Sequence, residues 1–264
     1  MNKMKNIFTI KSLKSVMYFI ASMVLLGGIW ELIARLTKNE VPSPAMTWEV
    51  FKEVMQNPFQ DDPDYKGIGT KLLSSLSRVG IGFGLGSLVA IPLGLIMGSS
   101  RSIMNIFNPI VQILRPVSPL AWFPLGLAIF QDSPKASIFM IFICALWPTV
   151  INTSVGTSSI SQDHKNVGKA FGFSTWKYIT KIMLPFTLPH IVTGLRLSIG
   201  VAWMVIVAGE MLSGGMGLGY FVWEEGFNGG SVAKILVAII IIGVVGLLLD
   251  KCFTYLQKRF TYSI

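Results

Sequence analysis

The sequence predicts an all-α polytopic membrane protein with six transmembrane helices. Of its 264 residues, 52% are hydrophobic and only 13% are charged, whereas a soluble domain of this length carries about 25% charged residues. Six apolar stretches approach or exceed the roughly 17–25 residues with which a helix crosses the bilayer core. Backbone groups in lipid must be satisfied internally, so these stretches are expected to form helices or broken helices. The six expected spans are Val16–Leu36, Val79–Gly98, Pro109–Phe130, Ser137–Val155, Leu197–Leu212 and Val232–Leu249.

The first apolar stretch follows a basic segment, as in a secretory signal peptide. The stretch is long, however, and no small-x-small cleavage pattern closes it. We therefore expect an uncleaved first span. The basic residues that precede it are Lys3, Lys5, Lys11 and Lys14.

A short amphipathic helix is predicted after the first span. Ser43 and Pro44 form an N-cap and a first-turn proline. The apolar side chains of the next eleven residues share one helical face, which polar side chains oppose. Two placements remain open: a helix lying on the outer membrane surface, or a helix packed on the outer ends of the spans.

The distribution of charge predicts that both termini are cytoplasmic. With this orientation, thirteen of the 22 Lys and Arg residues fall in inner segments beside two acids, Asp163 and Asp250. The inner side then carries about +11 and the outer side about −3, which is the positive-inside asymmetry. The net charge of +9 therefore needs no nucleic-acid partner.

The second span is rich in glycine, which predicts a face for close helix packing. Small residues four apart let transmembrane helices approach one another closely. The run that contains them is Gly80, Gly82, Gly84, Gly86, Gly94 and Gly98. Cys144 and Cys252 lie where a disulfide is not expected, and they are interpreted as structural.

The third span contains the motif RPVSPLAWFP at residues 115–124, with Pro109 upstream. Each proline removes a backbone donor and kinks a helix. Irregular backbone at membrane depth survives where it is buried in protein or lines a water-filled cavity. The span is therefore predicted to line a translocation path, the alternative being a kinked helix that only packs.

Five residues are candidates for that path, because charged and polar groups at membrane depth usually have a function. Arg115 could attract a small anion, or it could reach the headgroups or pair with a neighbouring helix. Glu210 is interpreted as a structural or gate contact rather than a ligand, because a carboxylate would repel an anion. The five candidates are Arg115, Ser118, Trp122, Trp203 and Glu210.

The longest inner loop, residues 157–189, predicts a protein contact. Its middle has the character of a helix, a glycine, a second helix and a proline, with Gly172 as the break. Val167, Ala170 and Phe171 would present a small apolar surface among lysines. A helix lying against the inner leaflet is the alternative.

This loop resembles the EAA loop of ABC importer permeases, whose pattern is Glu-Ala-Ala, three residues, Gly, nine residues, Ile-x-Leu-Pro. Gly172, Ile182, Leu184 and Pro185 match in register, whereas the opening triplet departs as Asn166-Val167-Gly168. Longer stretches at residues 75–98, 114–130 and 188–212 resemble the nitrate/sulfonate/taurine/bicarbonate branch. SGGMGLGYFVW at 213–223 and GVVGLLLDK at 243–251 are most similar to nitrate and bicarbonate members.

The resemblance implies a type I ABC importer permease fold, with residues 1–264 as one transmembrane domain and residues 157–189 as its coupling loop. It implies residence in a bacterial-type plasma (inner) membrane and partners: a second permease copy, two ATPase subunits and an extracytoplasmic binding protein. The chain would not be an enzyme and would hold no cofactor, because partner subunits bind ATP and Mg²⁺. The implied coupling residues are Asn166, Val167, Gly168, Lys169, Ala170, Phe171, Gly172, Ile182, Leu184 and Pro185.

The implied cargo is a small anion, nitrate first, with nitrite, cyanate or bicarbonate possible and alkanesulfonate or taurine as the alternative. A secondary transporter would also show six spans and a broken helix, but it would not need the matching loop. An intramembrane enzyme would need a nucleophile or metal cluster at depth, and no metal site is expected. LSGGM at 212–216 resembles the signature of ABC ATPases by chance, because the chain has no G-x-x-x-x-G-K-[ST] phosphate loop.

Overall fold

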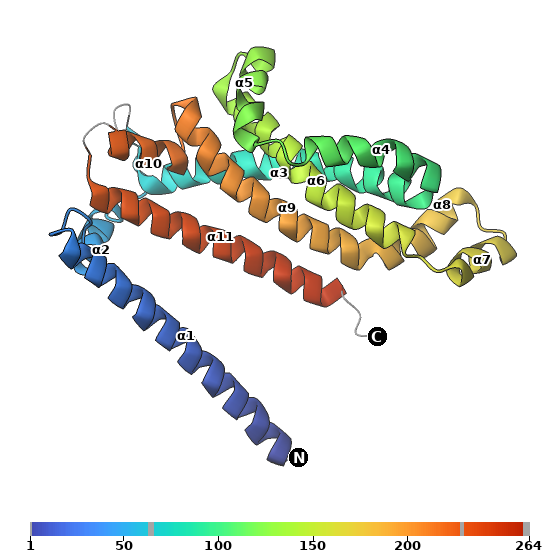
Figure 1. The fold of residues 1–264 in the computed structure, drawn as a ribbon, viewed down its shortest axis with the longest axis horizontal. Coiled ribbons are helices and arrows are strands. Elements are labelled where there is room, and N and C mark those ends of the chain that lie inside the picture. Colours follow the sequence, from blue (N-terminus) through green and yellow to red (C-terminus); the bar gives the residue numbers. More distant parts are fainter. Residues whose placement is uncertain (1, 63–65, 228–229, 261–264) are drawn as a thin grey trace.

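The computed structural model describes residues 2–62, 66–227 and 230–260, with side chains from residue 16 onward. The described residues form α-helices joined by short turns (Figure 1). In chain order the helices are α1 (Asn2–Leu36), α2 (Pro44–Val54), α3 (Ile68–Ser99), α4 (Arg101–Leu114), α5 (Pro119–Phe130), α6 (Ser133–Ser158), α7 (Gln162–Ala170), α8 (Thr175–Tyr178), the π-helical turn η1 (Ile179–Met183), α9 (Leu184–Ser213), α10 (Leu218–Phe227) and α11 (Val232–Phe260).

Five stretches of helix are long and apolar enough to cross a membrane, and a bent pair, α4 and α5, brings the possible number to six. The predicted set of spans is thus found, with corrected bounds. The third span begins at Arg101 rather than Pro109, and the sixth ends at Phe260 rather than Leu249. The second span begins at Ile68 rather than Val79, and α9 begins at Leu184 rather than Leu197. In both, the helix continues into polar sequence because part of that sequence is covered by neighbouring helices, as the 7% exposure of Lys71 in α3 and the full burial of Thr187 in α9 show.

The third predicted span is not one straight helix. α4 ends at Leu114, α5 begins at Pro119, and their axes differ by 97°. The bend falls within the predicted motif, where Pro116 and Pro119 deprive the chain of two backbone donors. The prediction of a broken helix is therefore confirmed, with the break between residues 114 and 119.

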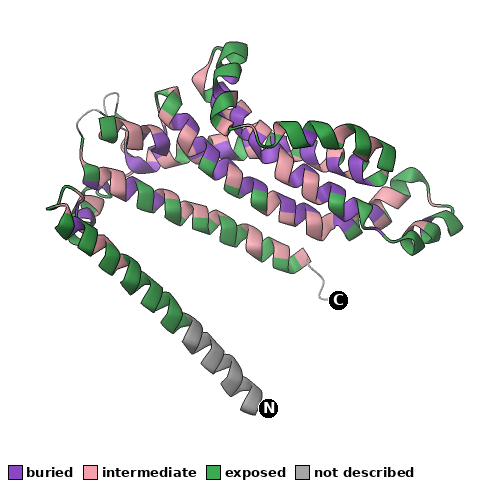
Figure 2. Cartoon of the chain, in the orientation of Figure 1, coloured by how far each residue is buried: buried purple, intermediate pink, exposed green. Residues whose placement is uncertain are grey.

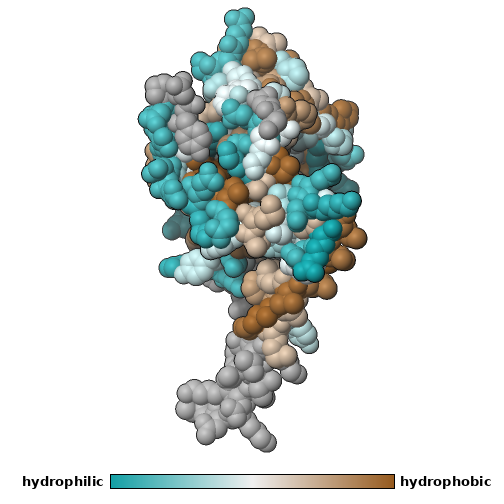
Figure 3. Space-filling model, turned by 90° about the vertical axis from the view of Figure 1, so that its left-hand side faces the viewer, coloured by the Kyte–Doolittle hydropathy of each residue, from teal (hydrophilic) through white to brown (hydrophobic). Residues whose placement is uncertain are grey.

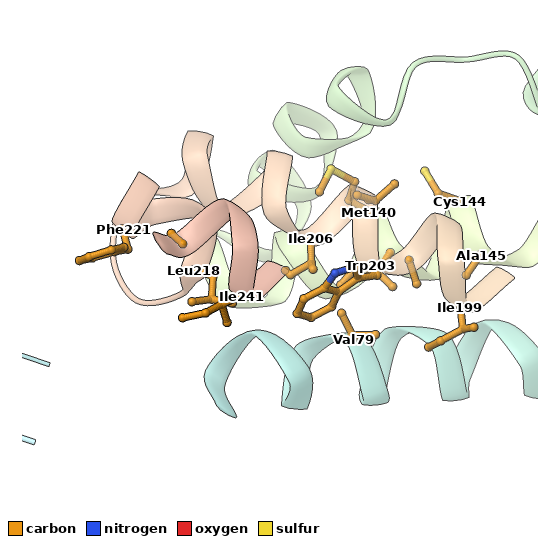
Figure 4. Packing of buried hydrophobic residues seen from close by; sticks show 14 of the residues in the cluster. Val79, Met140, Cys144, Ala145, Ile199, Trp203, Ile206, Leu218, Phe221 and Ile241 are labelled. Carbon is orange, nitrogen blue, oxygen red and sulfur yellow. The ribbon is translucent and has the colours of Figure 1, made fainter. Parts of the chain in front are cut away.

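α6 lies at the centre of the bundle, with α3, α5 and α9 packed around it. In Figure 4, Trp203 and Ile206 of α9 lie between Val79 of α3 and Met140 of α6. Hydrophobic burial of these side chains holds the three helices together. Buried residues concentrate along these helices, whereas α1 is exposed over most of residues 16–36, with Ala34 near its end buried (Figure 2).

Four of the six glycines that were predicted to form a packing face, Gly82, Gly86, Gly94 and Gly98, lie against α6, whereas a Cβ on Gly80 or Gly84 would meet nothing within 4 Å. A Cβ on Gly82 would lie 2.7 Å from Ile141, and one on Gly94 would lie 2.6 Å from Thr153. Gly86 and Gly98 meet α6 in the same way, and Ala90, which continues this four-residue spacing, is fully buried. The absence of side chains along this seam lets α3 and α6 pack at very short distance.

α2 packs against α11, which favours the second of the two placements left open by its sequence. Ser43 caps it by accepting a hydrogen bond from the Met46 N–H at 3.3 Å, with Pro44 in the first turn. α1 contacts α2 and then diverges from the bundle (Figure 1). Seen from the end that carries α2 and α10, hydrophilic side chains cover much of the surface, and hydrophobic ones follow its flank (Figure 3).

Candidate coupling loop and pathway residues

α7 and α8 form a helix–turn–helix at the end of the bundle opposite α2 and α10 (Figure 1). α7 ends in a Schellman turn: the Phe173 N–H donates to the Gly168 carbonyl at 2.9 Å, and the Gly172 N–H donates to the Lys169 carbonyl at 3.0 Å. Gly172 adopts φ +59°, a conformation that glycine accepts without strain. The predicted break at Gly172 is thus confirmed.

The turn leaves large apolar side chains exposed. Phe171 is 73% exposed and Trp176 is 74% exposed, and Val167 is exposed one turn before Phe171. We call Val167, Phe171 and Trp176 the apolar knob. Asn166 and Lys169 flank it, and both are exposed as well.

Gly168 holds α7 against the next helix. A Cβ at this position would lie 3.0 Å from the Tyr178 ring and 3.2 Å from the Ile182 Cδ1 atom. Gly168 is buried. It is the last residue of Asn166-Val167-Gly168, the triplet that differs from Glu-Ala-Ala, and it lies where α7 crosses the Tyr178–Ile182 segment. Leu184 is half-buried and Pro185 exposed at the start of α9.

The π-helical turn at Ile179–Met183 was not predicted. Pro185 has no N–H to donate to residue 181, and its ring would collide with that carbonyl in a regular α-helix. A wider turn just before it accommodates the proline, and such turns are frequent at functional sites. Pro185 was the only signal of it in the sequence.

Three of the five candidate pathway residues lie at the bend between α4 and α5. Arg115 is the C-cap of α4, and Ser118 is the N-cap of α5. Both are exposed, and Trp122, one turn into α5, is half-buried against the main core. A cation, a hydroxyl and an indole thus occur within eight residues of chain at the break.

The other two candidates lie inside the chain's own packing. Trp203 is 4% exposed, and its Nε1–H donates to the Ile242 carbonyl of α11 at 3.0 Å. A Cβ on Gly246 would approach the same ring at 3.0 Å. The indole thus fastens α9 to α11. The pathway roles of all five residues stay predictions.

Glu210 is fully buried, and its carboxylate joins α9 to α3 and α10. Ser75 Oγ lies 2.8 Å from both carboxylate oxygens. Arg78 Nη1 donates at 3.0 Å and the Gly219 N–H donates at 3.0 Å. A buried carboxylate persists when it is paired and hydrogen-bonded, and this one has both kinds of partner. We call Ser75, Arg78, Glu210 and Gly219 the Glu210 cluster.

The loop between α9 and α10 is shaped around this cluster. Arg78 Nη1 also donates to the Met216 carbonyl at 2.6 Å, and the Leu218 N–H donates to Ser75 Oγ at 3.0 Å. Gly217 has φ +146°, and a Cβ there would collide with the Glu210 carboxylate. Sequence reasoning missed Ser75 and Arg78, because nothing local indicates that the start of one span meets the end of another.

A second ion pair joins α3 to α10. Lys71 Nζ lies 3.4 Å from a Glu224 oxygen and 4.5 Å from the centre of the Phe221 ring. α3 therefore presents Lys71, Ser75 and Arg78 on one face, and all three contact α9 or α10.

Within the described residues, no group of three His, Cys, Asp or Glu could hold a metal ion.

The chain is similar in sequence to permease proteins of known transport systems. The chain is 40% identical to a nitrate import permease protein of Synechocystis sp. over 231 residues, 87% of this chain and 84% of that one. It is 39% identical to a bicarbonate transport system permease protein of Synechococcus elongatus, over 87% of this chain and 84% of that one.

Among solved structures, a bacterial alginate ABC transporter in complex with a pentasaccharide-bound periplasmic protein superposes with a TM-score of 0.63. The match covers 96% of this chain and 98% of that one at 18% identity, and it shows the fold alone. The fold is the predicted one, that of type I ABC importer permeases. Residues 90–262 match the family described as binding-protein-dependent transport system inner membrane component. With its apolar helices and these relatives, the chain belongs to the family of inner membrane components of binding-protein-dependent transport systems.

Proposed function

We propose that the chain is the permease subunit of an ABC importer that moves a small inorganic anion into the cytoplasm, nitrate first and bicarbonate second. The observation that carries this proposal is the likeness to nitrate and bicarbonate permeases over 87% of the chain. The exposed apolar knob supports it, because an ATP-driven permease needs a contact surface through which the ATPase subunits transmit their motion.

The apolar knob fits a protein socket better than a lipid surface. Asn166 and Lys169 flank Val167 on α7, so a helix that sank the knob into lipid would carry an amide and an ammonium with it. Burial of two aromatic side chains in a preformed socket gives a compact interface with a large apolar contribution. We assign this socket to an ATPase subunit.

The charge around the knob indicates what surrounds that socket. Lys165, Lys169, Thr175 and Tyr178 are among the residues that line a hollow of about 430 Å³ between α7 and α8. Complementary charge steers association and fixes register. The ATPase face is therefore expected to carry carboxylates around an apolar centre.

The helices behind the knob suggest how motion would travel. Gly168 seats α7 on Tyr178 and Ile182, and the chain continues without interruption into α9. α9 has 30 residues, about 45 Å of helix, and carries Glu210 near its far end. A displacement of the knob would therefore reach the Glu210 cluster through one element.

The assembly follows from the same proposal. Two copies of this chain would enclose the pathway, two ATPase subunits would bind ATP and Mg²⁺, and a binding protein would deliver cargo from outside. Residues 1–264 would form one transmembrane domain with both termini and the 157–189 loop in the cytoplasm. Arg115 and Ser118, exposed at the bend between α4 and α5, would face the cargo.

Reconstitution tests this function. Proteoliposomes holding the permease, its ATPase subunits and its binding protein are expected to take up nitrate only with ATP on the cytoplasmic side. Bicarbonate is expected to compete more strongly than taurine. Nitrate uptake by the permease alone, without ATP, would instead identify a secondary transporter. Stronger competition by taurine would move the cargo to the sulfonates.

Labelling in intact cells tests the orientation. Single cysteines near Asp61 and Glu224 are expected to react with an impermeant maleimide, whereas a cysteine at Lys165 is not. The outer positions belong to α10 and to the segment between α2 and α3, whereas Lys165 belongs to α7 at the opposite end of the bundle (Figure 1). Reaction at Lys165 in sealed cells would overturn the proposed orientation.

A further inference from the structure

A stripe of amide and guanidinium side chains runs the whole length of α4 and onto its C-cap. The five members follow one another at alternating spacings of four and three residues, so they lie within about 80° of one another around the helix axis. All five are exposed, and among the described residues none of their side chains has a hydrogen-bond or ion-pair partner. We call them the donor stripe: Arg101, Asn105, Asn108, Gln112 and Arg115.

The packing of α4 shows that it runs beside the spanning helices rather than away from them. α4 folds back along α3 (Figure 1), and Val111 of α4 belongs to the same buried cluster as Ala90 of α3 and Val150 of α6. Ala90 lies nine residues before the end of α3 at Ser99, about 14 Å along the helix. The donor stripe, about 21 Å long, therefore extends from one end of α3 to the depth of the bilayer core.

The opposite side of α4 is apolar, although it is just as exposed in the single chain. Three isoleucines lie more than about 100° around the helix from the centre of the donor stripe. Polar side chains within a membrane span face a water-filled cavity or the interior of a bundle, because lipid offers them no hydrogen bonds. The donor stripe is therefore expected to face water, and the isoleucines to face lipid. The isoleucines are Ile106, Ile110 and Ile113.

The chemistry of the stripe fits an anion. Guanidinium groups only donate hydrogen bonds, and the amide N–H groups of Asn and Gln can turn towards an acceptor. No Asp or Glu occurs between residues 65 and 131, so α3, α4 and α5 offer the stripe no carboxylate. A twofold contact of the stripe with its own copy would bring four guanidinium groups together without a counter-charge. A water-filled gap that admits anions avoids this repulsion.

We infer, on the basis of the proposed function, that the donor stripe lines the inner part of the pathway and passes an oxyanion from the bend at Arg115 to the cytoplasmic end at Arg101. Asn105, Asn108 and Gln112 would select for the anion between these two cations. Successive members are about 5–6 Å apart at their Cβ atoms, so a small oxyanion can reach the next donor before it leaves the last. Several weak sites in series allow both entry and release.

Thiol labelling tests the lining without assuming a cargo. In a background with Cys144→Ala and Cys252→Ser, one cysteine is placed on the stripe as Asn108→Cys and one on the apolar side as Ile110→Cys. Both positions are exposed in the single chain. In inside-out membrane vesicles that hold the complete importer, an anionic methanethiosulfonate is expected to react at least about tenfold faster with Asn108→Cys, because the reactive thiolate forms in water and not in lipid.

The charge of the reagent tests the preference for anions. At Asn108→Cys the anionic reagent is expected to gain at least about tenfold over a cationic methanethiosulfonate, after each rate is divided by its rate with free cysteine. Labelling no faster than at Ile110→Cys, a preference for the cationic reagent, or a disulfide between two copies at Asn108→Cys would each overturn the inference.

Nitrate uptake by proteoliposomes that hold the complete importer tests the same position with opposite charges. Asn108→Asp is expected to take up nitrate at least about tenfold more slowly than Asn108→Lys, because a carboxylate beside the path repels an anion. The two rates are compared at equal permease content and equal ATPase co-purification. Equal uptake by both variants would mean that Asn108 only packs, and would overturn the inference. Absence of nitrate uptake by the parental importer would instead contradict the proposed function, and the labelling would still decide whether the stripe lines an anion path.

Discussion

The two ends of the molecule use hydrophobic and polar side chains in opposite ways. At the end that carries α7 and α8, Phe171 and Trp176 are exposed to nearly three-quarters of their surface. At the end that carries α10, the Glu210 carboxylate is fully buried and hydrogen-bonded to three neighbours. The first end lacks a partner that would cover it, whereas the second is satisfied within the chain. Burial of the apolar side chains at the first end therefore requires a binding partner, whereas burial of the carboxylate at the second end is completed when the chain folds.

The largest expected effect is on the buried end. Arg78→Met leaves the Glu210 carboxylate without its cation, and breaking a buried pair in this way commonly costs about 3–5 kcal/mol. We expect a clearly lower midpoint of thermal unfolding in detergent and reduced membrane expression. Arg35→Met is the matched control, because the side chain of Arg35 is 76% exposed in its pair with Glu31. Equal stability of the two variants would show that the Glu210 cluster contributes little.

The next effect is on the exposed end, and it should leave folding intact. Phe171→Asp places a carboxylate in the proposed ATPase socket, and losing a central anchor commonly costs about 2 kcal/mol or more, roughly thirtyfold in affinity. Co-purification of the ATPase with the permease should fall accordingly, at unchanged membrane expression.

Lys177→Ala is the control for Phe171→Asp. The Lys177 ammonium lies 4.3 Å from the centre of the Phe173 ring, outside the apolar knob, so its loss should matter little. Normal co-purification of the ATPase with Phe171→Asp, at the parental transport rate, would mean that this loop is not the coupling element.

Glycine substitutions sharpen the contrast within one residue type. Gly217→Ala and Gly172→Ala both place a side chain at positive φ, at a cost of about 1–2 kcal/mol. Only at Gly217 does the new Cβ also collide with the Glu210 carboxylate, whereas Gly172 faces open space. Thermal unfolding should therefore be lowered more by Gly217→Ala. A larger loss of stability for Gly172→Ala would reverse the assignment of the two ends.

The smallest effect is expected for Gly168→Ala, which restores the third residue of the EAA triplet. The added Cβ gains up to about 1 kcal/mol in helix propensity, but it meets the edge of the Tyr178 ring at 3.0 Å and the Ile182 Cδ1 atom at 3.2 Å. These terms oppose each other, so stability and ATPase co-purification should both remain near the parental values. A severe loss of either would show that the crossing of α7 tolerates no side chain.

Features that depend on local sequence could be predicted from it. The break between residues 114 and 119 follows from prolines, and the turn at Gly172 follows from one glycine between two amphipathic stretches. The glycine face of α3 follows from its spacing. The starts of α3 and α9 were placed too late, because hydropathy does not register polar residues that neighbouring helices cover.

Features that depend on which helices meet could not be predicted. Ser75 and Arg78 lie more than 130 positions from Glu210 in the chain, and their sequence neighbourhood resembles any polar start of a span. The packing of α2 on α11 was one of two open placements for the same reason. The π-helical turn depends on how the backbone accommodates Pro185, and hydrophobic periodicity carries no information about that.

The glycine seam between α3 and α6 limits where conformational change can occur. Sliding of packed helices proceeds through repacking of side chains at the interface, and here the glycines of α3 offer none to repack against the side chains of α6. α3 and α6 should therefore move as a single rigid body, taking the Lys71–Arg78 segment with them. Any shear during transport would fall on interfaces that contain side chains, such as the contact of α9 with α11 around Trp203. Larger rotations would be confined to the bend between α4 and α5.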